Sequence, residues 1–195
     1  MIIRKLFKFE GAHIVRDCSS RRCKSSIHGH SYIVEIFLTS DKIDNGGMIA
    51  DFGLLKTTIK DFIDAFDHSY SMWSKEKPDF KKFIKQSSER WVEMPVTPSA
   101  EMYSLLMYYV IDRIIYNTEF NNGEGEVKLK SVRVHETSTG YAESFEEDLK
   151  YMDGTWNLND IIFSDQVMKE WQDPEMIDKL KNGIKFVNPI VDLLY

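Results

Sequence analysis

Apolar and polar residues alternate along four stretches of the chain, and this two-residue period predicts β-strands. Residues 2–9 place apolar side chains among charges, and residues 31–40 are rich in β-branched and aromatic side chains. Residues 127–137 alternate cleanly, and residues 140–148 follow as a last strand. The first two strands precede the helical part of the chain and the other two follow it.

Two stretches between these strands follow the helical period instead. Asp51 suits an N-cap, and apolar residues at helical spacing from Phe52 onward predict a first helix over residues 51–66. Residues 97–117 predict a second helix, with Pro98 in its first turn. The order β-β-α-α-β-β predicts an α+β fold.

Two further segments lie outside this pattern. A polar insertion, within residues 71–95, is expected to hold a short helix of its own. Residues 164–171 and 173–183 predict short helices, the second with Asp173 as cap, Pro174 in its first turn and Gly183 as its stop. We expect residues 1–149 to form one domain and residues 150–195 to form a mostly helical extension that packs on it.

Composition narrows the function classes. The chain has 195 residues, 25 of them basic and 31 acidic, with a net charge of −6, which is the wrong sign for a nucleic-acid-binding protein. The first residues alternate instead of forming a signal peptide, and no apolar run approaches the roughly 18 residues of a membrane span. We therefore expect a cytoplasmic protein without membrane or nucleic-acid partners. Thiols stay reduced there, which disfavours a Cys18–Cys23 disulfide.

Histidines mark the first candidate site. His28 and His30 are separated by one glycine, so on an extended segment their side chains share a face, and Gly29 permits close backbone approach. His13, at the end of the first strand, can add a third imidazole. Three imidazoles leave one position of a tetrahedral zinc open, as in catalytic zinc sites.

Two other interpretations of this region compete. An isolated His-x-His pair is more often surface-exposed or hydrogen-bonded than metal-bound. A Cys2His2 site with Cys18 and Cys23 is disfavoured, because zinc fingers separate their histidines by about three to five residues. Cys23 is either an inert thiol or a reactive one, and the four basic residues against one acidic residue in residues 16–24 favour the thiolate.

Acidic side chains supply further candidates downstream. Asp67 and His68 are adjacent at the end of the first predicted helix, and Glu136 lies at the end of the third predicted strand. Taken alone, either feature is usually incidental.

Together these motifs resemble the 6-pyruvoyl-tetrahydropterin synthase family, which includes the bacterial 6-carboxytetrahydropterin synthases of queuosine biosynthesis. The resemblance covers residues 3–147 and depends on six motifs in order: FEGAH, C…HGHSY, MIADFGLLK, FDHSY, PSAE and VHETSTGYA. It implies a T-fold (tunnelling fold), an antiparallel four-stranded sheet with two helices on one face. It also implies barrel-forming trimers stacked as a homohexamer, with active sites between subunits.

The resemblance also implies roles for individual residues. Zinc would be bound by His13, His28 and His30. Protons would be transferred by Cys23 and by the pair of Asp67 and His68. The pterin would be anchored by Glu136, and the substrate would also be contacted by Ser99, Glu101 and Thr137.

Ala100 departs from the pattern, since family members often carry a hydroxyl residue there. The implied reaction converts 7,8-dihydroneopterin triphosphate to 6-carboxytetrahydropterin with release of triphosphate and acetaldehyde. A 6-pyruvoyl-tetrahydropterin synthase, which leaves the side chain uncleaved, is the alternative within the family, and Cys23 argues against the branch that carries glutamate instead. A non-catalytic, zinc-stabilised assembly module is the alternative from another class.

Overall fold

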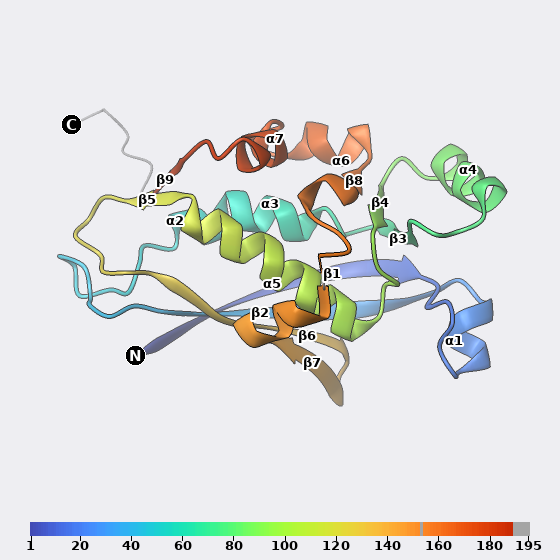
Figure 1. Cartoon of the computed structure of the whole chain (residues 1–195), viewed down its shortest axis with the longest axis horizontal. Helices are drawn as coiled ribbons and strands as arrows, with labels where there is room; N and C mark the ends of the chain where they lie inside the picture. Colours follow the sequence, from blue (N-terminus) through green and yellow to red (C-terminus); the bar gives the residue numbers. More distant parts are fainter. Residues whose placement is uncertain (153, 189–195) are drawn as a thin grey trace.

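The structure, a computed structural model, describes residues 1–152 and 154–188 and contains one large sheet covered by helices on one face (Figure 1). Four antiparallel strands follow the order β7-β6-β2-β1, which is the sheet that the T-fold predicts. These strands are β1 (Ile2–His13), β2 (His28–Thr39), β6 (Lys128–Thr137) and β7 (Gly140–Ser144).

The sheet continues beyond β1 with three strands that the sequence did not predict. β3 (Ser69–Trp73) pairs in parallel with the end of β1, β4 (Trp91–Met94) pairs in parallel with β3, and β8 (Ile162–Phe163) closes the edge. The expected helix of the insertion is α4 (Pro78–Ser87), which connects β3 to β4. The insertion is therefore a strand–helix–strand unit that widens the sheet.

Two helical segments cover the sheet. The predicted helix over residues 51–66 is divided at Thr57, whose φ of −113° and ψ of −102° are not helical, into α2 (Gly53–Lys56) and α3 (Thr58–Asp64). Asp51 is not the N-cap residue, although its carboxylate accepts a hydrogen bond from the Gly53 N–H at 2.6 Å. The long helix α5 (Ala100–Tyr116) is largely buried and starts at the Ser99 cap, after Pro98.

The core lies between the sheet and these helices. Alternate side chains of β2 and β6 point into it, including the fully buried Val34, Ile36 and Val134. Near the end of β1 and the start of β2, Phe9 stacks on Tyr32 at 4.5 Å between ring centroids, and Tyr103 of α5 packs on both rings. Within this aromatic group, Tyr32 lies next to His13 and His30, and Tyr103 lies next to His13.

Residues after 150 pack on the helical layer. Phe163 lies against Phe62 of α3 and against Trp171, and the buried Asp61 accepts a hydrogen bond from the Gln172 N–H at 2.7 Å. The helix expected over 173–183 starts later, at Met176. Asp173 lies before the helix, where its carboxylate accepts a hydrogen bond from the Glu175 N–H and pairs with Lys179 of the helix. The remaining elements are α1 (Arg21–Ser25), β5 (Thr118–Phe120), α6 (Asp165–Glu170), α7 (Met176–Lys181), β9 (Phe186–Asn188) and two 3₁₀ helices over Glu146–Met152 and Leu158–Asp160.

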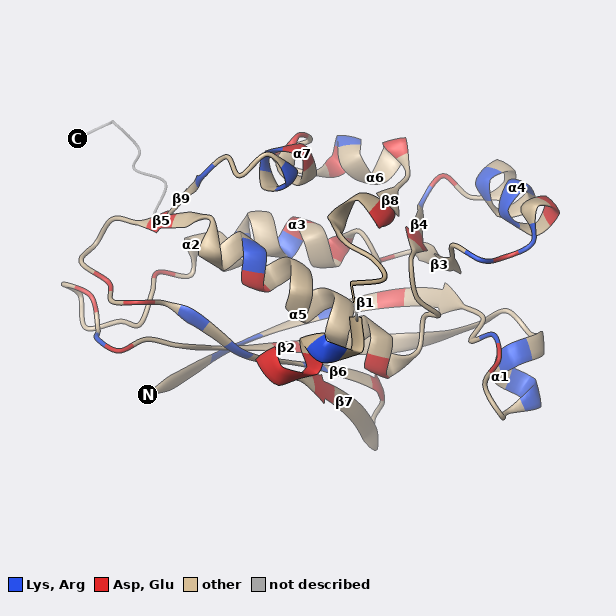
Figure 2. Cartoon of the chain, viewed as in Figure 1, with Lys and Arg blue, Asp and Glu red and all other residues tan. Residues whose placement is uncertain are grey.

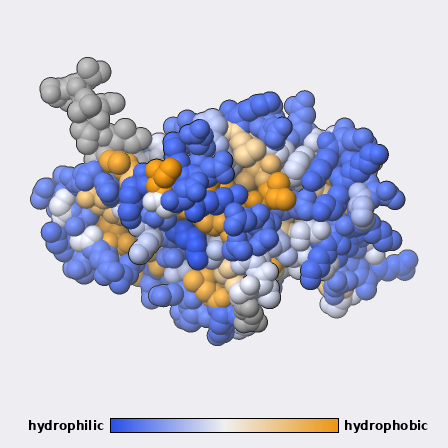
Figure 3. All heavy atoms as spheres, turned by 45° about the horizontal axis from the view of Figure 1, so that its top comes forward, coloured by the Kyte–Doolittle hydropathy of each residue, from blue (hydrophilic) through white to orange (hydrophobic). Residues whose placement is uncertain are grey.

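The division of the chain into domains at residue 149 stays a prediction. Residues 189–195 of the expected extension lie outside the described residues. Among the described residues, no helix combines the length and the apolar character that a bilayer crossing requires. On the face that Figure 3 shows, hydrophobic side chains occur in patches separated by hydrophilic ones.

Candidate metal centre and its surroundings

Three histidines meet where β1 ends and β2 begins. His13 is paired directly with His28 in the antiparallel register, and His30 lies two residues further along β2 on the same face. One ring nitrogen from each histidine lies within 4.8 Å of the other two. The predicted set of metal ligands is thus brought together by strand pairing alone.

Gly29 is required by this pairing. A Cβ atom at residue 29 would lie 2.9 Å from the carbonyl oxygen of Gly11 on the neighbouring strand. Because the obstructing atom belongs to the backbone of a paired strand, it cannot turn away as a flexible side chain would. The close approach expected from the sequence is confirmed.

Backbone carbonyls orient two of the rings. His13 Nδ1–H donates to the carbonyl oxygen of Pro98 at 2.6 Å, and His28 Nδ1–H donates to that of Ser26 at 3.0 Å. Since Nδ1 carries the proton, the lone pair of each ring lies on Nε2. A histidine that binds a metal usually donates its other ring N–H to a backbone carbonyl or a carboxylate in this way.

His13 is held as a neutral imidazole. Its side chain is fully buried, and this burial lowers the pKa of His13 from 6.5 to about 4, against the opposing hydrogen bond to Pro98. The hydroxyl of Tyr32 lies 3.3 Å from His13 Nδ1. Burial also raises the pKa of Tyr32 well above its usual value, so this phenol stays protonated beside the ring.

The residues fit a divalent metal ion. Three imidazoles converge, two of them with the proton on Nδ1 and the lone pair on Nε2, and the most buried ring is neutral. Imidazole nitrogen suits zinc, and a three-histidine set leaves a coordination position for a substrate or a water. The cluster can therefore hold a metal ion.

Glu136 lies beside this cluster. One of its carboxylate oxygens is 3.8 Å from His13 Nε2 and 3.9 Å from His30 Nε2. Glu136 comes from the end of β6, on the same face of the sheet as the histidines, and its side chain is 31% exposed. A partly exposed carboxylate at this place can accept hydrogen bonds from a molecule bound next to the histidines.

Asp67 and His68 form a hydrogen-bonded pair after α3. His68 Nδ1 donates to Asp67 Oδ2 at 2.8 Å, which leaves His68 Nε2 free on a side chain that is 75% exposed. Burial alone would raise the pKa of Asp67, but the hydrogen bond from the Glu10 N–H, His68 and the charge of Arg90 together hold it below its usual value. Asp67 is thus an ionised partner that orients the imidazole.

A cavity of about 590 Å³ connects this pair with the strands that carry the histidines. His68 and His30 both line it, as do residues 10–12 of β1 and Ser87 and Ser88 at the end of α4. A pterin-sized molecule fits such a volume. The insertion therefore forms part of the cavity wall.

Cys23 lies apart from this cavity. It belongs to α1, where Arg21, Arg22 and Lys24 surround it as a basic group visible in Figure 2. The thiol is half-buried and free, and the Cys23 carbonyl accepts a hydrogen bond from the Val15 N–H at 3.1 Å. Cys23 does not line the described cavity within one chain.

The three remaining predicted contacts are dispersed. Ser99 caps α5, its hydroxyl accepting from the Met102 N–H at 3.3 Å, and Thr137 is exposed at the turn between β6 and β7. Glu101 lines a separate cavity of about 370 Å³ between α5 and β7. Their roles in substrate binding stay predictions.

Sequence reasoning missed two groups that serve the histidines, the Tyr32 hydroxyl and the Pro98 carbonyl. Tyr32 had a signal, because it is two residues beyond His30 and so shares its face of the strand. Pro98 had none, because only the tertiary fold brings the start of α5 to the end of β1.

Comparison with known proteins supplies the functional context. A family model described as 6-pyruvoyl tetrahydropterin synthase matches residues 2–147. A protein of Helicobacter pylori strain J99 named 6-carboxy-5,6,7,8-tetrahydropterin synthase is 42% identical over 182 residues, covering 92% of this chain and 91% of its own. A protein of the same name from Aquifex aeolicus is 30% identical over 142 residues, covering 70% and 84%.

Solved structures agree at the level of the fold. An uncharacterized protein of Wolinella succinogenes superposes with a TM-score of 0.61 at 22% identity, covering 75% of this chain and 98% of that one. The 6-pyruvoyl tetrahydropterin synthase of Caenorhabditis elegans gives 0.51 at 18% identity, covering 74% and 94%. The T-fold expected from the sequence is confirmed.

Proposed function

The chain belongs to the 6-pyruvoyl tetrahydropterin synthase family, and we propose that it is a zinc-dependent lyase that forms 6-carboxy-5,6,7,8-tetrahydropterin from 7,8-dihydroneopterin triphosphate. The observation that carries the product assignment is the 42% identity to a named 6-carboxy-5,6,7,8-tetrahydropterin synthase across 92% of this chain. That alignment is too long to be confined to the family core, since it spans 182 residues. Triphosphate leaves, and water cleaves the side chain to release acetaldehyde.

The three histidines support the choice of zinc. His13, His28 and His30 would hold the ion, and a bound zinc ion would supply Lewis-acid chemistry toward the hydroxyl groups of the substrate side chain. Glu136, next to these rings, accepts the parallel N–H donors of the amino-pyrimidinone edge and so orients the pterin.

Proton transfer is assigned to Cys23 and to the Asp67–His68 pair. The Cys23 thiolate takes a proton from a side-chain carbon of the substrate, and His68 gives or takes a proton at Nε2 while Asp67 holds Nδ1–H. His68 supports this assignment because it lines the same cavity as His30.

We also infer that the site is completed between subunits of a homo-oligomer. Cys23 does not line the cavity of its own chain, and the sheet face opposite the helices exposes Ile2, Leu6 and Tyr141. Pairing of protomers through these sheets, as a homohexamer of stacked trimers, would cover that face and bring Cys23 of one protomer to His68 of another.

The first test supplies zinc-loaded protein with 7,8-dihydroneopterin triphosphate and identifies the products by mass. We expect 6-carboxytetrahydropterin, triphosphate and acetaldehyde, whereas a 6-pyruvoyl product without acetaldehyde would assign the other activity of the family. No consumption by folded, zinc-bound protein would contradict the enzyme assignment and favour a zinc-stabilised assembly module.

A second test addresses the roles and the shared site. Cys23→Ala and His68→Ala should each lower kcat about 100-fold or more, with zinc retained, because each removes a proton-transfer group. Mixed oligomers that combine the two variants should regain activity if Cys23 and His68 of different protomers form one site. Absence of recovery after verified subunit mixing would place both residues in sites of single chains.

A further inference from the structure

The turn that carries Asp67 and His68 is fixed to β1 on one side. Asp67 Oδ1 accepts from the Glu10 N–H at 2.7 Å, and the His68 N–H donates to the Glu10 carbonyl oxygen at 2.7 Å. His68 has a φ of +50°, in the left-handed region that residues other than glycine rarely adopt. Such a conformation persists only where surrounding contacts enforce it.

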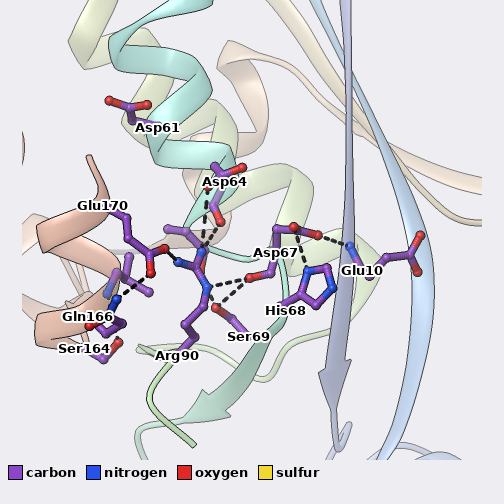
Figure 4. A network of polar contacts seen from close by, with 12 residues as sticks. Glu10, Asp61, Asp64, Asp67, His68, Ser69, Arg90, Ser164, Gln166 and Glu170 are labelled. Atoms are coloured by element: carbon purple, nitrogen blue, oxygen red, sulfur yellow. Dashed lines mark hydrogen bonds and ion pairs between the residues drawn. The ribbon is translucent and has the colours of Figure 1, made fainter. Parts of the chain in front are cut away.

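Arg90 holds the same turn from the opposite side (Figure 4). Its Nε–H donates to the Asp67 carbonyl oxygen at 2.8 Å, and Nη2–H donates to the Asp64 carbonyl oxygen at 2.7 Å. Nη1–H donates to the carboxylate of Glu170. One planar guanidinium therefore joins the end of α3, the Asp67–His68 turn and helix α6.

Arg90 and Glu170 are each held by further hydrogen bonds. The Arg90 carbonyl oxygen accepts from Ser88 Oγ at 2.8 Å and from the Tyr70 N–H at 3.2 Å. The second carboxylate oxygen of Glu170 accepts from Gln166 Nε2 at 2.6 Å. The Arg90 side chain is only 15% exposed. These contacts leave the guanidinium little freedom to reorient.

We propose that Arg90, braced by Glu170, is a positioning residue that keeps the Asp67–His68 turn in place, so that the His68 imidazole lines the cavity shared with His30. This inference rests on the proposed function, in which His68 moves a proton. It assigns a task to two segments outside the β-β-α-α-β-β core, because Arg90 belongs to the insertion and Glu170 to the residues after 150.

The fork geometry of arginine explains why this residue type is needed. A guanidinium donates in three fixed directions within one plane, whereas an ammonium group on a flexible stem does not reproduce that arrangement. Arg90→Lys therefore keeps the charge and loses the geometry, while Arg90→Gln loses both. If Arg90 acted through its charge alone, the lysine variant would behave like the wild type.

The kcat values of the variants should separate a positioning role of Arg90 from a role that depends on its charge alone. Proton transfer by a positioned side chain contributes about 10²- to 10⁴-fold, so misplacing His68 should lower kcat about tenfold or more. We expect this loss in both Arg90→Lys and Arg90→Gln, with KM within about threefold of the wild type and zinc content unchanged. Glu170→Gln, which removes only the charge of the brace, should lower kcat less, by about two- to fivefold.

The hydrogen bond of the pair gives a readout that does not depend on turnover. Nitrogen-15 NMR of the imidazole reports which ring nitrogen carries the proton. In the wild type His68 should carry it on Nδ1, bound to Asp67, and in both Arg90 variants the ring should move toward the tautomer mixture of an unpartnered imidazole. Arg113→Gln serves as the matched control, because Arg113 of α5 contacts Tyr109 and lies outside the proposed site.

The outcomes separate the two hypotheses. A folded Arg90→Lys variant with wild-type kcat and an unchanged His68 tautomer would overturn the positioning role. If Arg90→Lys and Arg90→Gln fail to fold, Glu170→Gln tests the proposal instead. An unchanged kcat and an unchanged His68 tautomer in that variant would refute the claim that Glu170 and Arg90 together position the Asp67–His68 turn. Wild-type protein that leaves the substrate intact would instead refute the proposed function, while the NMR measurement still tests how the turn is held.

Discussion

Replacing Gly29 by alanine tests whether strand packing sets the metal site. The added Cβ would lie 2.9 Å from the Gly11 carbonyl oxygen, whereas ordinary contacts begin at 3.4 Å, so the two strands must separate by about 0.5 Å at this point. Overpacking of this kind typically costs about 1–3 kcal/mol of unfolding free energy.

The displacement falls on the proposed ligands themselves, because His28 and His30 flank residue 29. Metal–ligand distances tolerate changes of only about 0.2 Å, so a shift of this size should disturb coordination. We expect zinc affinity to fall by about 10- to 100-fold, the range seen when the support of metal ligands is removed.

Competition with a chromogenic chelator measures this affinity, and denaturant unfolding with and without zinc measures the stability. Gly46→Ala is the matched control, because its Cβ would meet its nearest atoms, in Asp44 and Met48, at 3.4 Å, and the expected change is within about 0.5 kcal/mol. Wild-type zinc affinity in a folded Gly29→Ala protein would refute the role given to this close approach.

Three further predictions concern single residues. Burial of Glu35 raises its pKa, but hydrogen bonds from His135 and Arg4 outweigh this effect and hold the pKa below 4.5. The ionised Glu35 therefore stabilises the folded protein above pH 4.5, and this stabilisation is lost as the pH falls through the lowered pKa. Glu35→Gln should therefore cost about 1–2 kcal/mol at pH 7 and less near pH 3 in urea unfolding. Ser99→Ala removes the α5 cap and should lower stability by about 1 kcal/mol, while a loss of kcat/KM in the still folded protein would mark a substrate contact. Trp171→Ala leaves a cavity against Phe163 and should cost about 3–5 kcal/mol in the same assay.

The strongest local patterns correctly predicted the four strands and the long helix of the T-fold core. Alternation located the four core strands, and helical spacing located α5. The first helix was predicted as one piece, yet Thr57 interrupts it with non-helical backbone angles. Apolar spacing alone did not reveal that break, because the residues on both sides remain in phase with the core.

The histidine cluster and the Asp67–His68 pair were predictable because their residues are close in the sequence or share the face of one strand. His28 and His30 share a face through the period of a strand, and the Asp67–His68 pair is adjacent in the chain. Their surroundings were not predictable. Pro98 reaches His13 across 85 residues, and Arg90 bonds to Glu170 across 80 residues, so no window of sequence contains both partners.

The sequence by itself determined which residues are candidates for the chemistry and which face of each core element is apolar, since both depend on residue type and short-range periodicity. Only the tertiary structure decided that the insertion extends the sheet as β3 and β4, that β8 closes its edge, and that Glu170 holds Arg90 against the Asp67–His68 turn. The physical reason is that strand pairing and buried hydrogen bonds join distant segments. Their partners are selected by the geometry of the whole fold and not by the residues next to them.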